Sequence, residues 1–197
     1  MSASTFLSYA RGILPHIPVG HWVVMGAVSL ALTVILLIRK KCPVYGAVAM
    51  GLTVFMGLFV LDAAVVIRYL GITPHTSGCN LTLDLSRLFR KTGQGPAESI
   101  SNIAVFVPFG FFLAEFLAST KRLDSWRRIG WVVLAAFCLS LCIECLQLLL
   151  KVGYFEVTDL GMNTLGGLIG ALMGAGVRML SKRMKRSKSA HCLKCIN

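Results

Sequence analysis

Carboxylate and amide side chains interrupt an otherwise apolar stretch at residues 144–170, which reads ECLQLLLKVGYFEVTDLGMNTLGGLIG. An ionisable group in the middle of a membrane helix costs about 2.5–3.5 kcal/mol on insertion scales, so it usually has a partner or a task. Glu144 and Asp159 are of the type that can serve as acid and base or accept hydrogen bonds from a polar ligand. The residues that could form such a site are Ser140, Glu144, Gln147, Lys151, Asp159 and Asn163.

The spacing of these residues predicts polar faces on two neighbouring helices. Ser140 and Gln147 lie one turn to either side of Glu144, and a polar stripe of this kind cannot face lipid. A connection of about nine residues then leads to Asp159, and Asn163 follows one turn later. We therefore expect antiparallel helices whose polar side chains meet at a similar depth and form a ligand-facing pocket. The alternative is that the amides and Glu144 only hydrogen-bond one helix to the other.

Composition places these helices in a membrane. The 197 residues are 56% hydrophobic and only 14% charged, and the mean hydropathy of +0.75 exceeds that of an ordinary soluble domain. A membrane span needs about 20 mostly apolar residues. Five stretches qualify: Val19–Ile38, Val44–Ile67, Ile100–Leu117, Ile129–Leu150 and Leu160–Leu180. The fold class expected is an all-α integral membrane protein with about five transmembrane helices, because a single segment satisfies its backbone in lipid only as a helix.

Basic residues predict the orientation of the chain. Of the 20 lysines and arginines, 14 lie in 39–41, 121–128 and 178–194. In a chain with the five predicted spans, these three segments lie on the same side of the membrane. Positive residues mark the cytoplasmic side, so we expect the N-terminus outside and the C-terminus in the cytoplasm. Residues 1–18 and 81–91 have apolar positions at helical spacing and are expected to form helices on the outer interface.

The net charge of +12 and the seven cysteines have simpler explanations than a dedicated site. Topology accounts for the charge, so we expect membrane lipids as partners and no nucleic acid. Cys138, Cys142 and Cys145 are expected to be buried as small packing residues of the fourth span. The tail sequence HCLKC lies in a charged segment that we expect to be disordered, and it lacks the second ligand pair of a structural zinc site. We therefore expect no metal and no cofactor.

Two further carboxylates and a glycine face stand apart from the 144–170 stretch. Glu115 is near the cytoplasmic end of the third span and is expected to reach the headgroups beside Lys121 and Arg122. Asp62 could pair with another residue inside the bundle. Small residues at intervals of four let another helix approach closely, and the fifth span has Gly166, Gly170 and Gly174 at this interval, with Asn163 continuing the same face.

Three motifs follow one another in this chain: SNIAVFVPFGFFLAEF, ECLQ and DLGMNTLGGLIG. This ordered set resembles the VanZ-like family of small bacterial membrane proteins, whose pattern is an Asn ahead of a Phe-x-Pro-x-Gly helix, then a Glu-x-x-Gln helix and an Asp-x-x-x-Asn-Thr-x-Gly helix. The resemblance covers about residues 98–177 and adds Asn102 to the candidate site. The family commonly has an arginine six positions before the motif aspartate, where this chain has Gly153. Lys151 could supply the charge, although a lysine lacks the bidentate fork of a guanidinium.

The resemblance implies a division of the chain and a location in the bacterial cytoplasmic membrane. The segments are an interfacial N-terminus at 1–18, two N-terminal spans at 19–70 outside the resemblance, an external loop at 71–97, a VanZ-like three-helix core at 98–180 and a basic cytoplasmic tail at 181–197. The family is named for an accessory membrane protein associated with tolerance of glycopeptide antibiotics such as teicoplanin. The resemblance therefore implies a role in the cell envelope.

Three classes of function fit these observations. The first is a protein that binds a lipid-linked or amphiphilic envelope molecule, such as a cell-wall or polysaccharide precursor, at the outer leaflet. The second is a membrane enzyme that uses Glu144 and Asp159 on a lipid-linked substrate, although the sequence has no nucleophile elbow and no phosphate-cradling glycine loop. The third is a small transporter, but five spans divide into equal inverted halves only in a dimer. A homodimer is left open.

Overall fold

The structure of the chain is a computed structural model, and it describes residues 17–71, 77–84, 95–120 and 123–194. Most of the predicted interfacial helix at 1–18 lies outside these residues, as does the second half of the predicted helix at 81–91. Residues 81–84 have no helical structure, so the described part of that second helix was predicted wrongly.

Five long helices make up most of the described structure. Their bounds are Val19–Ile38 for α2, Val44–Leu61 for α3, Gly95–Ser119 for α5, Ser125–Leu149 for α6 and Val157–Lys194 for α7. A π-helix at Asp62–Val66, η2, and a last turn at Ile67–Tyr69, α4, extend α3. All five helices are long and apolar enough to cross a membrane, which confirms the predicted number of spans and a multi-pass membrane protein.

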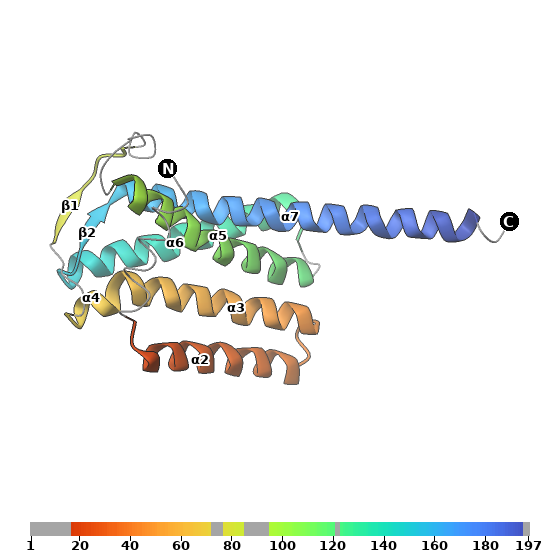
Figure 1. Cartoon of the computed structure of the whole chain (residues 1–197), viewed down its shortest axis with the longest axis horizontal. Coiled ribbons are helices and arrows are strands. Elements are labelled where there is room, and N and C mark those ends of the chain that lie inside the picture. The colour runs from red at the N-terminus through yellow and green to blue at the C-terminus, as the bar shows by residue number, and fades with distance from the viewer. Residues whose placement is uncertain (1–16, 72–76, 85–94, 121–122, 195–197) are drawn as a thin grey trace.

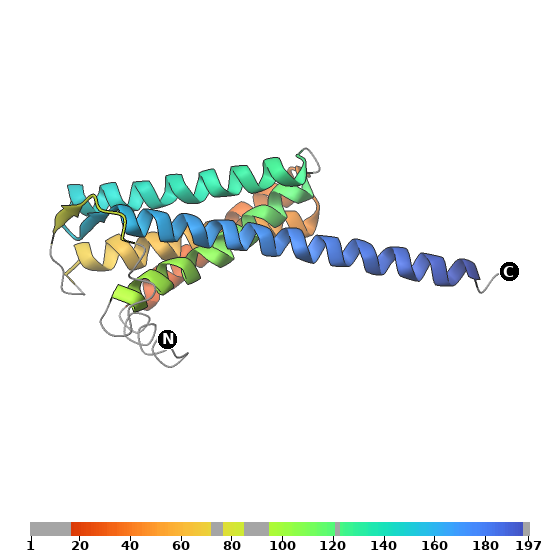
Figure 2. The same cartoon turned by 90° about the horizontal axis from the view of Figure 1, so that it is seen from above.

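The helices lie side by side along one direction, and α7 projects far beyond the others (Figure 1). The end of the bundle that carries the strands β1 and β2 is called the strand end here, and the end from which α7 projects is called the tail end. Helices α5 and α7 both run from the strand end to the tail end, and α6 runs in the opposite direction beside α7 (Figure 2). Helix α2 packs against α3, α3 packs against α5, and the helices α5, α6 and α7 pack together.

Helix α7 continues through most of the segment that we expected to be a disordered tail. It ends at Lys194, so the expectation is wrong for residues 181–194. The sequence between Ser181 and Lys194 contains no glycine and no proline, and it is rich in lysine and arginine. These are good helix formers, and extending an existing helix avoids the cost of nucleation.

The glycine face of α7 packs directly against the backbone of α5. A side chain at Gly166 would collide with the carbonyl oxygen of Ile103, and one at Gly170 would collide with the carbonyl oxygen of Val107. At Gly174 the nearest atom would be Oε1 of Glu115 at 3.3 Å. The predicted close helix approach is confirmed, and α5 is the partner helix.

Two short strands close the strand end of the bundle. Strand β1, Gly78–Asn80, pairs in parallel with strand β2, Tyr154–Glu156, so that Cys79 lies opposite Phe155. Thr158 extends this contact, because its hydroxyl donates to the Thr82 carbonyl and accepts from the Asp84 N–H. The all-α expectation therefore needs one correction, since part of the predicted loop at 71–97 is bound to the connection between α6 and α7.

The three cysteines of α6 face outward, which contradicts their predicted burial. Cys138, Cys142 and Cys145 are all exposed, whereas Ser140 and Glu144 face the bundle. Each residue of an α-helix is rotated by about 100° from the one before, so the polar stripe and the cysteines lie on different sides of the helix. A thiol is a small and weakly polar group that is compatible with an apolar surface.

Candidate functional site

Glu144 is buried at the strand end and accepts a hydrogen bond from the backbone. Only 2% of its surface is exposed, and its Oε2 atom accepts from the N–H of Glu156 at 2.8 Å. Glu156 is the last residue of β2, so the strand pairing holds its N–H in the direction of α6. An unpaired carboxylate in this position would be far more costly than a hydrogen-bonded one.

Ser140 and Asn163 join α6 to α7 one turn deeper in the bundle. The Asn163 amide nitrogen donates to the Ser140 hydroxyl at 2.8 Å, and the two residues are 5% and 0% exposed. This contact confirms that α6 and α7 are antiparallel neighbours whose polar positions meet. Asn163 therefore bonds to α6, while the glycine face at Gly166 and Gly170 contacts α5.

Gln147 connects the cluster to the second membrane span. Its amide nitrogen donates to the carbonyl of Ala64 at 3.1 Å, and Ala64 lies in the π-helix η2. A π-turn displaces the regular hydrogen bonds of a helix and often marks a functional position. The sequence reasoning did not include this span in the site, because a bulge of one residue leaves no pattern in an apolar run.

Arg68, rather than Lys151, brings the positive charge to this end of the bundle. Lys151 is exposed beyond the last turn of α6 and has a φ of 56°. The half-buried Arg68 extends over Gly153, where its Nη1 atom would lie 3.0 Å from a Cβ. Arg68, Asp159 and Glu156 all exert a charge interaction on Glu144. A role for Lys151 in the site stays a prediction, and the sequence reasoning missed Arg68 because it is distant in the sequence.

Asp159 and Asn102 complete the predicted set in different ways. Asp159 is half-buried in the first turn of α7 and close enough for its charge to act on Glu144. Asn102 is half-buried on α5, next to Ile103, whose carbonyl contacts Gly166. Within the described ranges, no hydrogen bond links Asn102 to the other candidates. The strand-end cluster is therefore defined here as Arg68, Ser140, Glu144, Gln147, Glu156, Asp159 and Asn163.

The other two carboxylates have partners of their own. Asp62 lies 2.7 Å from Nδ1 of His21, so a pair within the bundle joins α2 to the end of α3. Glu115 pairs with Arg178 of α7, with 2.7 Å between Oε2 and Nη2 and 3.1 Å between Oε1 and Nε. The expectation that Glu115 reaches toward headgroups is wrong, because the parallel packing of α5 and α7 brings a guanidinium to it.

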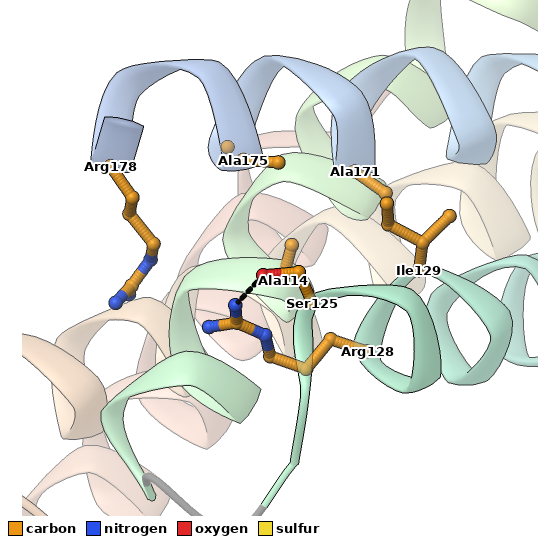
Figure 3. A pocket seen from close by; sticks show the side chains of 8 residues that line it. Ala114, Ser125, Arg128, Ile129, Ala171, Ala175 and Arg178 are labelled. Carbon is orange, nitrogen blue, oxygen red and sulfur yellow. Dashed lines mark hydrogen bonds between the residues drawn. The ribbon is translucent and has the colours of Figure 1, made fainter. Parts of the chain in front are cut away.

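A small hollow at the tail end lies among α5, α6 and α7 (Figure 3). Two arginines and several small residues line it. In the part of the chain that the structure describes, no three histidine, cysteine, aspartate or glutamate side chains are placed to hold a metal ion. The strand-end cluster contains carboxylates, amides, a hydroxyl and a guanidinium.

Comparison with known proteins identifies the family. The sequence profile of the VanZ/LLP1 family matches residues 43–178. The chain belongs to the VanZ/LLP1 family. It is 31% identical over 105 residues to a protein of Enterococcus faecium named Protein VanZ, an alignment that covers 52% of this chain and 50% of the relative. The chain therefore spans about half the length of the curated relative that it matches. No solved structure matches the chain.

The VanZ/LLP1 match extends beyond the three helices in which the resemblance was recognised. It begins at residue 43 and so includes α3, η2 and α4, which the sequence reasoning had placed outside the family region. All members of the strand-end cluster lie within the matched residues. Helix α2 and His21 lie outside them.

Proposed function

We propose that this VanZ/LLP1 protein binds a lipid-linked or amphiphilic envelope molecule at the strand-end cluster, in the outer leaflet of the bacterial cytoplasmic membrane. The observation that carries the proposal is Glu144, a carboxylate that is 2% exposed and lies among apolar helices. A buried carboxylate is expensive in a membrane helix, and such groups commonly mark a ligand or ion site. Structural contacts between helices can be made by neutral polar groups, as the Asn163 amide and the Ser140 hydroxyl make one.

The chemistry of the cluster fits a polar headgroup that carries both hydrogen-bond donors and a phosphate. Glu144, Glu156 and Asp159 can accept hydrogen bonds from hydroxyl or amine groups of a sugar or peptide. Arg68 offers a planar guanidinium, the side chain best suited to bind a phosphate in two places. Glu156, Asp159 and Arg68 are only half-buried, so they form the accessible edge through which a headgroup reaches the cluster.

The distribution of charge supports an outward-facing strand end. The basic segments 39–41 and 178–194 lie at the tail end or beyond it, and they hold most of the positive charge together with 121–128. The positive-inside rule then places the tail end in the cytoplasm and the strand end outside. Glycopeptide antibiotics act on outward-exposed cell-wall precursors, so an outward site is consistent with a role in tolerance of teicoplanin.

The function can be tested with variants that keep shape and remove charge. We expect expression of the chain in a glycopeptide-sensitive Gram-positive host to raise the inhibitory concentration of teicoplanin at least fourfold over the empty vector. Glu144→Gln retains an oxygen that can accept from the Glu156 N–H, and Asp159→Asn is similarly isosteric. Both variants should accumulate in the membrane at normal levels and lose the protection, because the ligand contact requires the charge.

Glu115→Gln is the matched control, since it removes a carboxylate at the tail end and should retain the protection. If Glu144→Gln protects as well as the unaltered chain does, the cluster has only a packing role.

Native mass spectrometry of the detergent-purified protein identifies the ligand. We expect a lipid-linked saccharide or another amphiphile to copurify with the unaltered protein and to be lost in Glu144→Gln. Chemical conversion of that ligand by the purified protein would instead indicate an enzyme.

A further inference from the structure

A polar contact on one side of the bundle joins α2 to the beginning of η2. Nδ1 of His21 lies 2.7 Å from Oδ1 of Asp62, and Asp62 is only 6% exposed. The ring of Trp22 packs against Phe55 and Phe59 of α3, which fixes the rotation of α2 at this level. Helix α2 lies outside the matched VanZ/LLP1 residues and packs against α3 (Figure 1). Neither residue of the polar contact belongs to the strand-end cluster.

Asp62 is the first residue of η2, and η2 determines the direction of the residues that follow it. The N–H of Ile67 donates to the Asp62 carbonyl five residues earlier, whereas a regular α-helix uses the residue four positions earlier. One residue corresponds to about 100° of rotation in an α-helix. Whether residues 62–66 form a π-turn or a regular turn therefore decides in which direction Arg68 points.

Two groups that follow Asp62 contact the strand-end cluster or belong to it. The Ala64 carbonyl, inside η2, accepts from the Gln147 amide at 3.1 Å. Arg68 extends over Gly153, beside the Gln147 side chain. A π-turn is a rare feature of a helix. In the described structure this one is held from two sides, by α2 at its first residue and by α6 in its middle.

We propose that His21 and Asp62 are positioning residues for the strand-end cluster: their contact holds the beginning of η2, and η2 directs Arg68 to its place over Gly153. A carboxylate buried among apolar helices is far less costly when it is paired, so Asp62 keeps η2 in one position relative to α2. Among the described residues, Oδ2 of Asp62 has no hydrogen-bond partner, so the carboxylate depends on His21. The positioning is a property of the fold, and only its consequence for ligand binding rests on the proposed function.

The test is a double-mutant cycle between residues 21 and 153 in the full chain in detergent. The atoms nearest to a Cβ at residue 153 belong to Arg68 and Gln147, so Gly153→Ala reports whether Arg68 is in place. His21→Leu should reduce the loss of melting temperature caused by Gly153→Ala by about half or more, because coupled residues have non-additive effects. His21→Asn keeps a polar group at the position of Nδ1 and should leave that loss unchanged.

Thr33→Val is the matched control, because it removes a polar contact between the same two helices at the other end of α3. The Thr33 hydroxyl donates to the Ala47 carbonyl at 3.5 Å. In the Thr33→Val background, Gly153→Ala should cost as much as in the unaltered protein. Additive effects of His21→Leu and Gly153→Ala, or equal reductions in the two backgrounds, would overturn the proposal. So would a Gly153→Ala variant without any loss, because Arg68 would then not occupy this place.

A second variant covers the case in which His21→Leu does not fold because Asp62 is left unpaired. Replacing both partners of a buried polar contact by apolar groups is close to neutral for stability. The double variant with His21→Leu and Asp62→Leu should therefore fold, and Gly153→Ala should again be less costly in its background. An unchanged cost there would overturn the proposal.

The same variants separate this proposal from the proposed function. Protection against teicoplanin should be lost in the double variant at His21 and Asp62 and retained in Thr33→Val. If the cycle shows coupling but the unaltered chain gives no protection, the proposed function fails and the positioning stands. If the unaltered chain protects but the cycle is additive, the positioning fails alone. A double variant that shows the coupling and still protects would overturn the role of His21 and Asp62 in ligand binding.

Discussion

At the scale of single residues, the strand-end cluster consists of polar groups that are satisfied by partners distant in the sequence. Glu144 accepts from a backbone N–H of β2, and Gln147 donates to a backbone carbonyl of η2. A buried polar group without such a partner costs about 1–3 kcal/mol, so these contacts hold α6 in one rotation relative to its neighbours. The cluster is therefore both a structural connection and a set of oriented acceptors.

Gly153 lies against the ends of the Arg68 and Gln147 side chains. A Cβ at residue 153 would lie 3.0 Å from Nη1 of Arg68 and 3.1 Å from Cδ of Gln147, which is closer than side chains normally approach. We expect Gly153→Ala to displace both groups and to lower the free energy of unfolding by about 1–3 kcal/mol. Thermal unfolding of the purified protein measures the change.

A double variant separates the two contacts at Gly153. Arg68→Ala removes one of them, so Gly153→Ala should be less costly in the Arg68→Ala background than in the unaltered protein. Gly161→Ala is the control, because its nearest contact, Leu83, is at an ordinary 3.5 Å. Equal melting temperatures for Gly153→Ala and the unaltered protein would contradict the placement of Arg68.

At the scale of helices, the contact between α5 and α7 is the closest in the bundle. Gly110 of α5 faces Gly167 of α7, and the carbonyls of Ile103 and Val107 lie where side chains of Gly166 and Gly170 would be. Without a hydrophobic driving force between helices in lipid, close backbone packing supplies much of the attraction. This contact also fixes the depth of Asn163 and Asp159 relative to α6.

A large residue at Gly170 should separate these helices. The new side chain would meet Val107 and would lie 2.6 Å from the Phe111 nitrogen, and neither backbone atom can move without shifting α5. We expect Gly170→Leu to lower the melting temperature and the folded fraction in detergent, since overpacking a tight core costs about 1–3 kcal/mol or more. Fluorescence-detected size exclusion after heating measures both quantities.

Gly176→Leu is the control for this prediction. Gly176 lies on the same helix, and a Cβ there would have no atom within 4 Å. The variant should unfold at the temperature of the unaltered protein or slightly above it, because leucine forms helices better than glycine does. Similar losses from the two substitutions would mean that α7 tolerates no large residue for reasons unrelated to α5.

At the scale of the whole molecule, the two ends of the bundle are built differently. The strand end has a pair of short strands and the cluster of carboxylates, and the tail end has the Glu115–Arg178 pair, the hollow and the long basic projection of α7 (Figure 1). Basic residues are held back on the cytoplasmic side during insertion, so this asymmetry sets the expected orientation.

Reporter fusions test the orientation directly. Fusions after Lys41, Arg128 and Ser189 should be active only for a cytoplasmic reporter, and a fusion near Thr92 should be active only for an external one. The expectation rests on the 14 of 20 basic residues that lie in the segments assigned to the cytoplasm. An external signal at Ser189 would reverse the map and would place the strand-end cluster in the cytoplasm.

The sequence by itself determined the class of the protein, its five spans and most members of its candidate site. Apolar runs of span length and the helical spacing of Ser140, Glu144 and Gln147 are local properties, so they can be read without a structure. The VanZ-like motifs and their order along the chain can also be recognised from the sequence alone. The glycine intervals of α7 predicted a close helix contact for the same reason.

Only the tertiary structure decided which groups meet. The pairing of β1 with β2, the contact of Gln147 with Ala64 and the place of Arg68 over Gly153 join residues separated by dozens of positions. The outward direction of Cys138, Cys142 and Cys145 depended on which face of an almost uniformly apolar helix turned inward. The packing of neighbouring helices decides which face of a helix turns inward. When both the core and the lipid are apolar, the two faces have similar residues, so the sequence contains little periodic pattern that predicts the inward face.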